Sequence, residues 1–260
     1  MNPVIKVENV TKNFGGLRAV NDLSMEIREH RINALIGPNG AGKTTTINLL
    51  TGVLRPDTGT IRLNGESVVG LPEYRIARAG VRRTFQNLKL FGRMTTLENV
   101  MVGAQGQDTS LLRYIVDPFY ASRMEKQLRE QAEEAVEYVG LTPYRDKAVR
   151  DLPYGIQKRI EIARALAAKP SVLFLDEPAT GLNPTERAEL VRLMYKIKED
   201  KITILIIEHN MDVIMSTSDW ITVLNFGTKI AEGTPEEVRN DDLVIEAYLG
   251  SRFKKAEGEG

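Results

Sequence analysis

Apolar and polar residues alternate along the first part of the chain. Residues 4–8, 23–27 and 61–63 have a period of two, which predicts strands with one buried and one solvated face and favours an antiparallel arrangement. A short, mostly apolar run at 32–36 is embedded among them. It leads into a glycine-rich loop and a predicted helix over 43–51, which Gly52 ends from the position after the C-cap.

The pattern changes to a helical one between residues 92 and 152, which are rich in Glu, Arg, Gln and Ala. The clearest helix is "SRMEKQLREQAEEAVEYVG", where Ser122 and Glu125 have the spacing of a capping box and Gly140 ends the helix. Its apolar residues fall on one face. We interpret this part as a mostly helical insertion that forms a subdomain of its own.

Strands and helices alternate again in the last third. The apolar runs at 172–175 and 202–207 are continuous, which suits strands of a parallel sheet buried on both faces. Predicted helices at 156–168 and 185–199 alternate with them. "WITVLNFGTKIAEG" predicts a hairpin followed by one or two short helices, and we expect the tail at 251–260 to be disordered.

Composition narrows the possible functions. Among 260 residues, 35 Lys and Arg balance 35 Asp and Glu, so no basic excess indicates nucleic-acid binding. The absence of Cys excludes disulfides and thiolate metal sites, and two His exclude a multi-histidine cage. No apolar stretch reaches the length of a signal peptide or of a membrane span. We therefore expect a protein that does not cross a membrane but can dock on one.

The glycine-rich loop matches G-x-x-x-x-G-K-[ST] between a predicted strand and a predicted helix, as a phosphate-binding loop requires. Its backbone N–H groups and the helix N-terminus bind phosphate oxygens, Lys43 adds a positive charge, and the Thr44 hydroxyl is placed for Mg²⁺. The alternative is a turn that merely reverses the chain. The predicted nucleotide-binding set is Gly37, Pro38, Asn39, Gly40, Ala41, Gly42, Lys43, Thr44 and Thr45.

A second candidate group follows the apolar strand in "VLFLDEP", which ends in Asp176 and Glu177. Buried carboxylates are costly unless a cation or hydrogen-bond donors meet them. Beside a phosphate loop, Asp176 would reach Mg²⁺ through water, and Glu177 would act as general base on the attacking water. The alternative is a helix N-terminus with acidic residues in its first turn.

At this point the chain closely resembles the ATP-binding subunit of ABC transporters, over about residues 4–250. Phe14 stands where the family stacks an aromatic ring on adenine, and Gln86 in "RRTFQNLKLF" matches the glutamine that reaches Mg²⁺ and the γ-phosphate. "LPYGIQKRIEIARAL" resembles the signature loop and helix, and "DEPATGLNP" the acidic strand end plus the loop at the dimer interface. His209 in "ILIIEHNM" matches the switch histidine.

The resemblance implies an α/β fold for an ATPase domain over 1–250. This fold has a P-loop NTPase core with a mostly parallel sheet, an amino-terminal antiparallel β subdomain and a helical subdomain inserted at about 87–165. It also implies that two subunits enclose two ATP molecules, with Lys43, Glu177 and His209 catalytic in each site and Mg²⁺ held by Thr44, Gln86 and Asp176. The partner subunit's site would receive Tyr154, Gly155, Ile156, Gln157 and Asn183.

Two positions depart from the usual family pattern. The signature serine is replaced by Pro153, which has neither a hydroxyl nor an N–H, and we expect slower or weaker closure of the dimer. Asn183 stands where many relatives carry aspartate, so it keeps an acceptor and loses the charge.

Within the family, the chain most resembles the larger ATPase of branched-chain amino acid importers. "NVTKNFGGLRAVNDLSMEI", "LLRYIVDPFYASRMEKQ" and "AEGTPEEVRNDDLVIEAYLG" carry this resemblance. It implies a second ATPase subunit, identical or different, two membrane permeases, an indirect periplasmic binding protein, no nucleic acid, and a peripheral place at the cytoplasmic face of the inner membrane. Alternatives are import of other amino acids, amides or urea, lipopolysaccharide export, and an ABC ATPase without a transport role.

Overall fold

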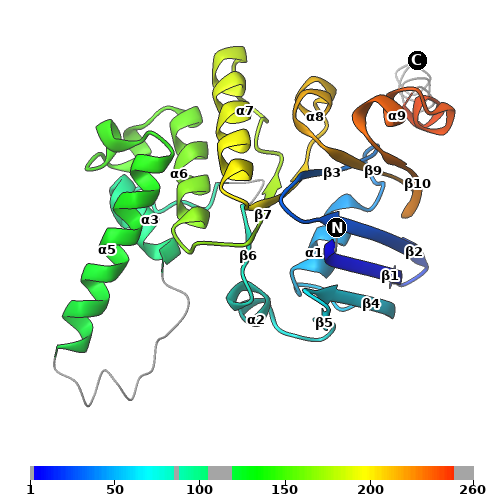
Figure 1. The fold of residues 1–260 in the computed structure, drawn as a ribbon, viewed down its shortest axis with the longest axis horizontal. Helices are drawn as coiled ribbons and strands as arrows, with labels where there is room; N and C mark the ends of the chain where they lie inside the picture. The colour runs from blue at the N-terminus through cyan, green and yellow to red at the C-terminus, as the bar shows by residue number, and fades with distance from the viewer. Residues whose placement is uncertain (1–2, 85–87, 105–118, 249–260) are drawn as a thin grey trace. The chain divides into compact units, whose positions relative to one another are not determined.

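The computed structural model describes residues 3–84, 88–104 and 119–248. It divides into two compact units (Figure 1). The first consists of Met1–Ile76 with Met194–Gly260, and the second of Ala77–Leu193. The boundaries fall inside two helices, α2 (Glu73–Arg78) and α7 (Pro184–Glu199).

An antiparallel sheet with strand order β2-β1-β4-β5 forms one part of the first unit. Burial follows the predicted alternation in β1, where Ile5 and Val7 are buried and Lys6 between them is exposed. The predicted antiparallel strands are confirmed, although β1 and β2 are longer than the alternating runs because they pair through bulges near Asn9 and Asp22. The strands are β1 (Pro3–Phe14), β2 (Leu17–Arg28), β4 (Thr58–Leu63) and β5 (Glu66–Ser67).

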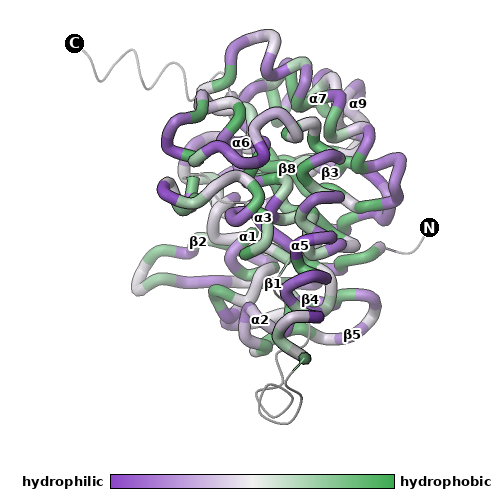
Figure 2. Tube along the Cα trace, turned by 90° about the vertical axis from the view of Figure 1, so that its left-hand side faces the viewer, coloured by the Kyte–Doolittle hydropathy of each residue, from purple (hydrophilic) through white to green (hydrophobic). Residues whose placement is uncertain are grey.

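The parallel strands of the first unit are centred on β3 (Ile32–Ile36), for which the sequence analysis predicted a strand but no parallel partner. β3 pairs in parallel with β8 (Thr203–Ile207) on one side and with β9 (Trp220–Asn225) on the other. Every residue of β3 and β8 is buried, and both strands lie in hydrophobic parts of the chain in Figure 2. The predicted hairpin is confirmed by the antiparallel pairing of β9 with β10 (Thr228–Gly233).

Helices of the first unit follow its strands closely. α1 (Lys43–Leu50) begins directly after the glycine loop, and Gly52 has a φ of 79° beyond its end, as predicted from its place after the helix. α8 (Met211–Thr217) and α9 (Pro235–Arg239) follow β8 and β10. α9 has a complete capping box between Thr234 and Glu237, and a further helical segment covers 242–248.

Among its described residues, the second unit contains three packed helices and two strands, together with most of α7 and the end of α2. α3 (Thr96–Ala104), α5 (Tyr120–Tyr138) and α6 (Tyr154–Leu166) lie side by side in Figure 1. β6 (Val81–Arg83) pairs in parallel with β7 (Val172–Asp176), and every residue of β7 is buried. Two short 3₁₀ helices complete the unit, η1 (Thr142–Tyr144) and η2 (Val149–Asp151).

Two predicted helix starts are wrong. α5 begins at Tyr120, so Ser122 lies inside its first turn and does not cap it. The helix extends backwards because nothing at residues 120–121 opposes a helical backbone, and alanine favours one. α6 begins at Tyr154, so Gly155 belongs to the helix instead of preceding it. A capping box is found at α3, where Thr95 and Glu98 exchange backbone and side-chain hydrogen bonds.

The α/β class, the antiparallel amino-terminal sheet and the helical subdomain agree with the sequence prediction. The second unit also contains β6 and β7, so the bounds of 87–165 for the insertion stay a prediction. The tail at 251–260 lies outside the described residues. Over the part of the chain that the structure describes, none of the helices has both the length and the apolar character of a membrane span.

Candidate functional site

The predicted site residues are divided between the two units. The phosphate loop, Phe14 and His209 belong to the first unit, whereas Asp176, Glu177, the signature loop and Asn183 belong to the second. Gln86 lies outside the described residues.

The phosphate loop connects β3 to α1 and is packed tightly against neighbouring backbone. A Cβ added to Gly37 would lie 2.1 Å from the Leu224 carbonyl oxygen, and one added to Gly42 would lie 2.5 Å from the Ala19 carbonyl oxygen. Both glycines also have positive φ angles, 152° and 100°. These two positions therefore require glycine for space as well as for backbone conformation.

The turn between β9 and β10 supports the loop from one side. The Gly227 N–H donates to the Ala41 carbonyl at 3.0 Å, and the Asn21 N–H donates to the Gly227 carbonyl at 2.8 Å. The turn thus connects the phosphate loop to β2. The sequence analysis missed this support, because a Phe-Gly turn in a hairpin carries no signal for the loop that it will contact.

Lys43 lies across its own loop. Its Nζ donates to the carbonyl oxygens of Gly37 and Pro38 at 2.7 and 2.9 Å. α1 starts at Lys43 with Gly42 as N-cap, and its first turn contains no acidic residue. The helix N-terminus and the ammonium group together provide positive potential at one place, with the Thr44 side chain beside it. This arrangement suits a phosphate group.

Phe14 and His209, both predicted to contact nucleotide, are solvent-accessible. The Phe14 side chain is 46% exposed at the end of β1, with Lys12 Nζ 5.7 Å from its ring centroid. His209 follows β8 directly, and its backbone N–H donates to the buried Glu208 carboxylate at 3.1 Å. Asn210 then caps α8 through its side chain. Glu208 and Asn210 thus hold the backbone of the predicted switch histidine on both sides.

Tyr248 is a neighbour of the phosphate loop that the sequence analysis missed. Burial raises the pKa of Tyr248 to about 12, and the nearby Gly37 backbone acts in the opposite direction. The helical segment 242–248 therefore ends close to the first glycine of the loop. No motif relates a tyrosine near the end of the chain to a loop two hundred residues earlier.

Asp176, the last residue of β7, forms an ion pair with an arginine of the same unit. Arg83 Nη2 lies 2.8 Å from Asp176 Oδ2, and both side chains are largely buried. Thr84 adds a hydroxyl that accepts from the Asp176 backbone N–H at 3.3 Å. A buried carboxylate needs such partners. The parallel pairing of β6 with β7 places Arg83 and Thr84 beside Asp176 and so supplies these partners. In the sequence, Arg83 is only the second of two adjacent arginines, with no sign that it will reach Asp176.

Glu177 has a backbone conformation that glycine usually adopts. Its φ is 48°, and it precedes Pro178, although a residue before proline favours extended backbone. Thr180 closes the turn by donating its N–H to the Glu177 carbonyl and its hydroxyl to Glu177 Oε2, both at 3.3 Å. The carboxylate is thereby held above a sharp turn at the end of β7.

The signature segment forms the start of α6. Pro153 is the N-cap, and Tyr154 is 43% exposed in the first turn. Gly155 is buried, and a Cβ there would lie 2.3 Å from Glu186 Oε1, so this glycine leaves room for the Glu186 side chain of α7. Gln157 Nε2 donates back to the Leu152 carbonyl at 2.8 Å. The remaining signature residue, Ile156, is half-buried.

Asn183 caps α7. Its side-chain oxygen accepts from the Glu186 N–H at 2.9 Å, and the Glu186 carboxylate accepts from the Asn183 N–H at 2.9 Å. The amide of Asn183 therefore serves as the cap of α7 without a negative charge. The place of Asn183 at a subunit interface stays a prediction.

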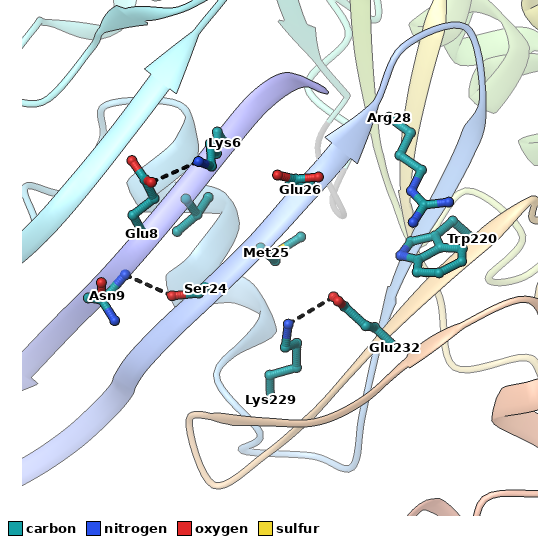
Figure 3. A pocket seen from close by; sticks show the side chains of 11 residues that line it. Lys6, Glu8, Asn9, Ser24, Met25, Glu26, Arg28, Trp220, Lys229 and Glu232 are labelled. Carbon is teal, nitrogen blue, oxygen red and sulfur yellow. Dashed lines mark hydrogen bonds and ion pairs between the residues drawn. The ribbon is translucent and has the colours of Figure 1, made fainter. Parts of the chain in front are cut away.

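A separate open cavity of about 410 Å³ lies against β1, β2, β9 and β10 (Figure 3). Four of its charged side chains form two ion pairs, Lys6 with Glu8 at 2.9 Å and Lys229 with Glu232 at 2.9 Å, and Glu26 adds a further carboxylate to the lining. The Arg28 guanidinium stacks on Trp220, 3.3 Å from the ring centroid. Among the described residues, those predicted to bind nucleotide do not line this cavity, and its paired charges do not resemble an anion site.

Comparison with known proteins identifies the family. A family model described as ABC transporter matches residues 20–180. The chain is 45% identical over 250 residues to the high-affinity branched-chain amino acid transport ATP-binding protein BraF of Pseudomonas aeruginosa, covering 95% of this chain and 98% of BraF. The chain belongs to the ABC transporter family. As an ABC ATPase, it binds ATP and hydrolyses it.

Further relatives of this ABC ATPase agree in fold and in carboxyl-terminal sequence. It is 46% identical over 250 residues to LivG of Salmonella typhimurium, with 95% and 98% of the two chains covered. A crystal structure of a nucleotide-free ATP-binding cassette from an ABC transporter superposes with a TM-score of 0.84 at 31% identity, covering 95% of this chain and 99% of that one. A second family model, branched-chain amino acid ATP-binding cassette transporter, matches residues 228–254.

Proposed function

We propose that this ABC ATPase powers the import of branched-chain amino acids through a separate membrane permease. The observation that carries the proposal is the match of residues 228–254 to the branched-chain amino acid transporter model. This segment lies outside the general ABC transporter match at 20–180. The names of BraF and LivG, similar over nearly the whole chain, point to the same transported class.

The phosphate loop supplies the binding step of the proposed mechanism. The loop and the α1 N-terminus bind the phosphates of ATP, Lys43 neutralises charge on the β- and γ-phosphates, and Phe14 stacks on the adenine. Lys43 already donates to two loop carbonyls, so it exchanges these for phosphate oxygens with little movement of the backbone. The charge of the lysine then acts at a position that the loop has fixed.

Mg²⁺ fits the donor set of the proposed site. The Thr44 hydroxyl and the Asp176 carboxylate are hard oxygen ligands, with Gln86 as a third, and Asp176 acts through water. Because Arg83 binds one carboxylate oxygen of Asp176, the carboxylate is oriented before any ion arrives. When bound, the ion neutralises charge that develops on the phosphates.

Glu177 and His209 act at the γ-phosphate in this proposal. Glu177 accepts a proton from the attacking water, and the turn that Thr180 closes holds its carboxylate in place. His209 contacts the γ-phosphate from the end of β8. Residues 154–157 and Asn183 contact the nucleotide of a second ATPase subunit, where Pro153 lowers the rate of closure because it lacks the usual hydroxyl.

The permease would dock around residues 86–94, at the cytoplasmic face of the membrane, of which 88–94 lie within the described residues. Phe91 is 51% exposed, while Leu88 and Leu90 are half-buried. A cavity of about 370 Å³ adjoins Phe91 within the second unit. Four cations, Arg82, Arg83, Lys89 and Arg164, line this cavity together with one carboxylate, Glu161. Arg83 is paired with Asp176 and Arg164 with Glu161. The lining still has an excess of positive charge, so we expect the permease segment that enters it to be acidic.

The first experiment is a mild-detergent pull-down of the tagged protein from its host membranes, with mass spectrometry of the chains that co-purify. Two different polytopic permeases and a second, shorter ATPase support the importer. Ligand binding by the matching periplasmic protein then separates branched-chain amino acids from other amino acids, amides or urea. A lipopolysaccharide-type permease pair, or soluble partners alone, would contradict the proposed transport role.

A further inference from the structure

Lys158 is a buried lysine on α6 to which the proposed mechanism gives no role. The residue is 4% exposed, although lysine is almost never fully buried unless it is paired. Its Nζ donates to the Glu177 carbonyl oxygen at 3.4 Å. The same ammonium lies 5.7 Å from the ring centroid of Tyr154, one helical turn earlier. The cation therefore lies between α6 and the turn that carries the proposed general base.

The turn after β7 contacts α6 at a second point. A Cβ added to Gly181 would lie 2.8 Å from Tyr154 Cε1, so the end of the turn is packed against that ring. Tyr154 and Lys158 are four residues apart, which places them on one face of α6. This face therefore contacts the turn at its beginning, Glu177, and at its end, Gly181.

The contact at Glu177 matters because its backbone conformation is unfavourable. With a φ of 48° and a proline next in sequence, this residue favours extended backbone unless its surroundings prevent it. At 3.4 Å this hydrogen bond is long, but its donor carries a full charge, and the burial of Lys158 shields the attraction to the carbonyl from water. Lys158 acts on the carbonyl of the one residue whose side chain must point at the attacking water.

We infer that Lys158 is a positioning residue for ATP hydrolysis, which ties the backbone of Glu177 to α6 and so fixes the direction of the Glu177 carboxylate. The inference rests on the role of Glu177 proposed above. Since α6 also begins with the signature segment, a movement of this helix would reach Glu177 through the same contact. Nucleotide binding by the phosphate loop does not depend on Lys158.

The test compares Lys158→Met and Lys158→Arg with Lys169→Met in the full chain. Lys169 is a matched control, since it lies in the same unit with a side chain that is 65% exposed and paired with Glu134. Steady-state hydrolysis gives kcat and KM, a fluorescent ATP analogue gives nucleotide affinity, and amide hydrogen exchange reports on residues 177–182. Thermal unfolding is followed for every variant.

We expect Lys158→Met to lower kcat by about tenfold or more, within the range for a misplaced general base. Its KM and its affinity for the analogue should stay within about twofold, because the phosphate loop is intact. Amide exchange at 177–182 should increase. Lys158→Arg should recover most of kcat, since it keeps a buried positive donor, and Lys169→Met should match the wild type.

Wild-type kcat and exchange in Lys158→Met would overturn the inference. A second result would also overturn the inference. In it, Lys158→Met loses kcat only in proportion to a lower thermal midpoint, KM changes as much as kcat, and Lys158→Arg does not recover the activity. If the methionine variant does not fold, Lys158→Gln replaces it with the same expected results. Glu177→Gln is measured in parallel: full hydrolysis in that variant would refute the proposed base itself, whereas its loss beside an active Lys158→Met refutes only the role of Lys158.

Discussion

The phosphate loop and the acidic turn after β7 both follow a fully buried strand, but they are stabilised in different ways. The loop is held by backbone groups, since its glycines approach the carbonyls of Leu224 and Ala19 and Gly227 donates to Ala41. The acidic turn is held mainly by side chains that come from β6 and α6. The phosphate loop therefore depends on close backbone packing, and the acidic turn depends on contacts with side chains of neighbouring elements.

This difference has a consequence for substitution. A loop held by backbone contacts tolerates changes to most side chains but not an added Cβ at its packed glycines. A turn held by charged side chains tolerates substitutions elsewhere in the turn. It does not tolerate the loss of a buried cation, because a carboxylate or carbonyl then loses its partner.

Lys43→Ala should lower ATP hydrolysis by about a thousandfold or more, the range for removal of a cation that acts on a transferring phosphoryl group. The fold of the loop should survive, because its packing against Leu224, Ala19 and Gly227 does not involve the lysine. Phosphate release assays and thermal unfolding measure the two properties separately. Lys6→Ala, an exposed lysine of the same unit, is the control. Wild-type turnover of Lys43→Ala would refute the phosphate-loop assignment.

Arg83→Met should destabilise the protein by about 3–4 kcal/mol, since it leaves the Asp176 carboxylate buried without this cation. The neighbouring Arg82→Met is the control, because the Arg82 guanidinium donates to the carbonyls of Ala77 and Val81 and not to Asp176. Its effect should be clearly smaller. Urea unfolding measures both. Equal losses in the two variants would show that the ion pair with Asp176 does not stabilise this turn.

Gly37→Ala should cost about 2–3 kcal/mol, because its Cβ would meet the Leu224 carbonyl and force the loop apart from β9. Gly40→Ala is matched to it within the same loop. Gly40 also has a positive φ, 79°, but a Cβ there has no neighbour within 4 Å, so about 1 kcal/mol of backbone strain is expected. Denaturant unfolding and nucleotide affinity of the two variants decide whether close packing, and not φ alone, requires glycine at position 37.

The smallest effects are expected at two matching helix caps, one in each unit. Hydrogen bonds from the Thr95 backbone and hydroxyl lower the pKa of Glu98, and those from Thr234 lower the pKa of Glu237. A carboxyl group whose pKa is lower in the folded state than in the unfolded state stabilises the fold at every pH above the unfolded value, near 4.5. This stabilisation is lost as the pH falls below 4.5 and through the lowered pKa.

Glu98→Gln and Glu237→Gln should therefore each lower the melting temperature slightly at pH 7, and the difference from the wild type should shrink as the pH falls below 4.5 and through the lowered pKa of each carboxyl group. Calorimetry from pH 7 down through that range measures it. A difference that stays constant with pH would assign the effect to side-chain shape instead of charge. A difference in only one variant would show which of the two units limits thermal stability.

Features that depend on residues close together in the sequence were predicted more accurately than features that depend on distant residues. The strand at 32–36, the start of the helix at Lys43 and its end before Gly52 were predicted correctly, because an apolar run and glycines act on residues close in sequence. Phosphate binding by the loop between them stays a prediction. Two other helix starts were less well predicted: Ser122 has the spacing of a cap, yet α5 begins before it, and α6 includes Gly155. The spacing of residues in the sequence identifies the possible N-caps of a helix, and the packing of the helix determines which of them is used.

The family, the class of fold and the places of the glycine loop after β3 and of the acidic pair after β7 could be read from the sequence alone. Each of these depends on short periodic patterns or on motifs with fixed spacing. The tertiary structure decided which distant groups stabilise them: Arg83 at Asp176, Lys158 at Glu177, and the β9–β10 turn at the loop. These contacts join residues from 19 to almost 200 positions apart, and they form only when strands pair and helices pack, so no local pattern in the chain encodes them.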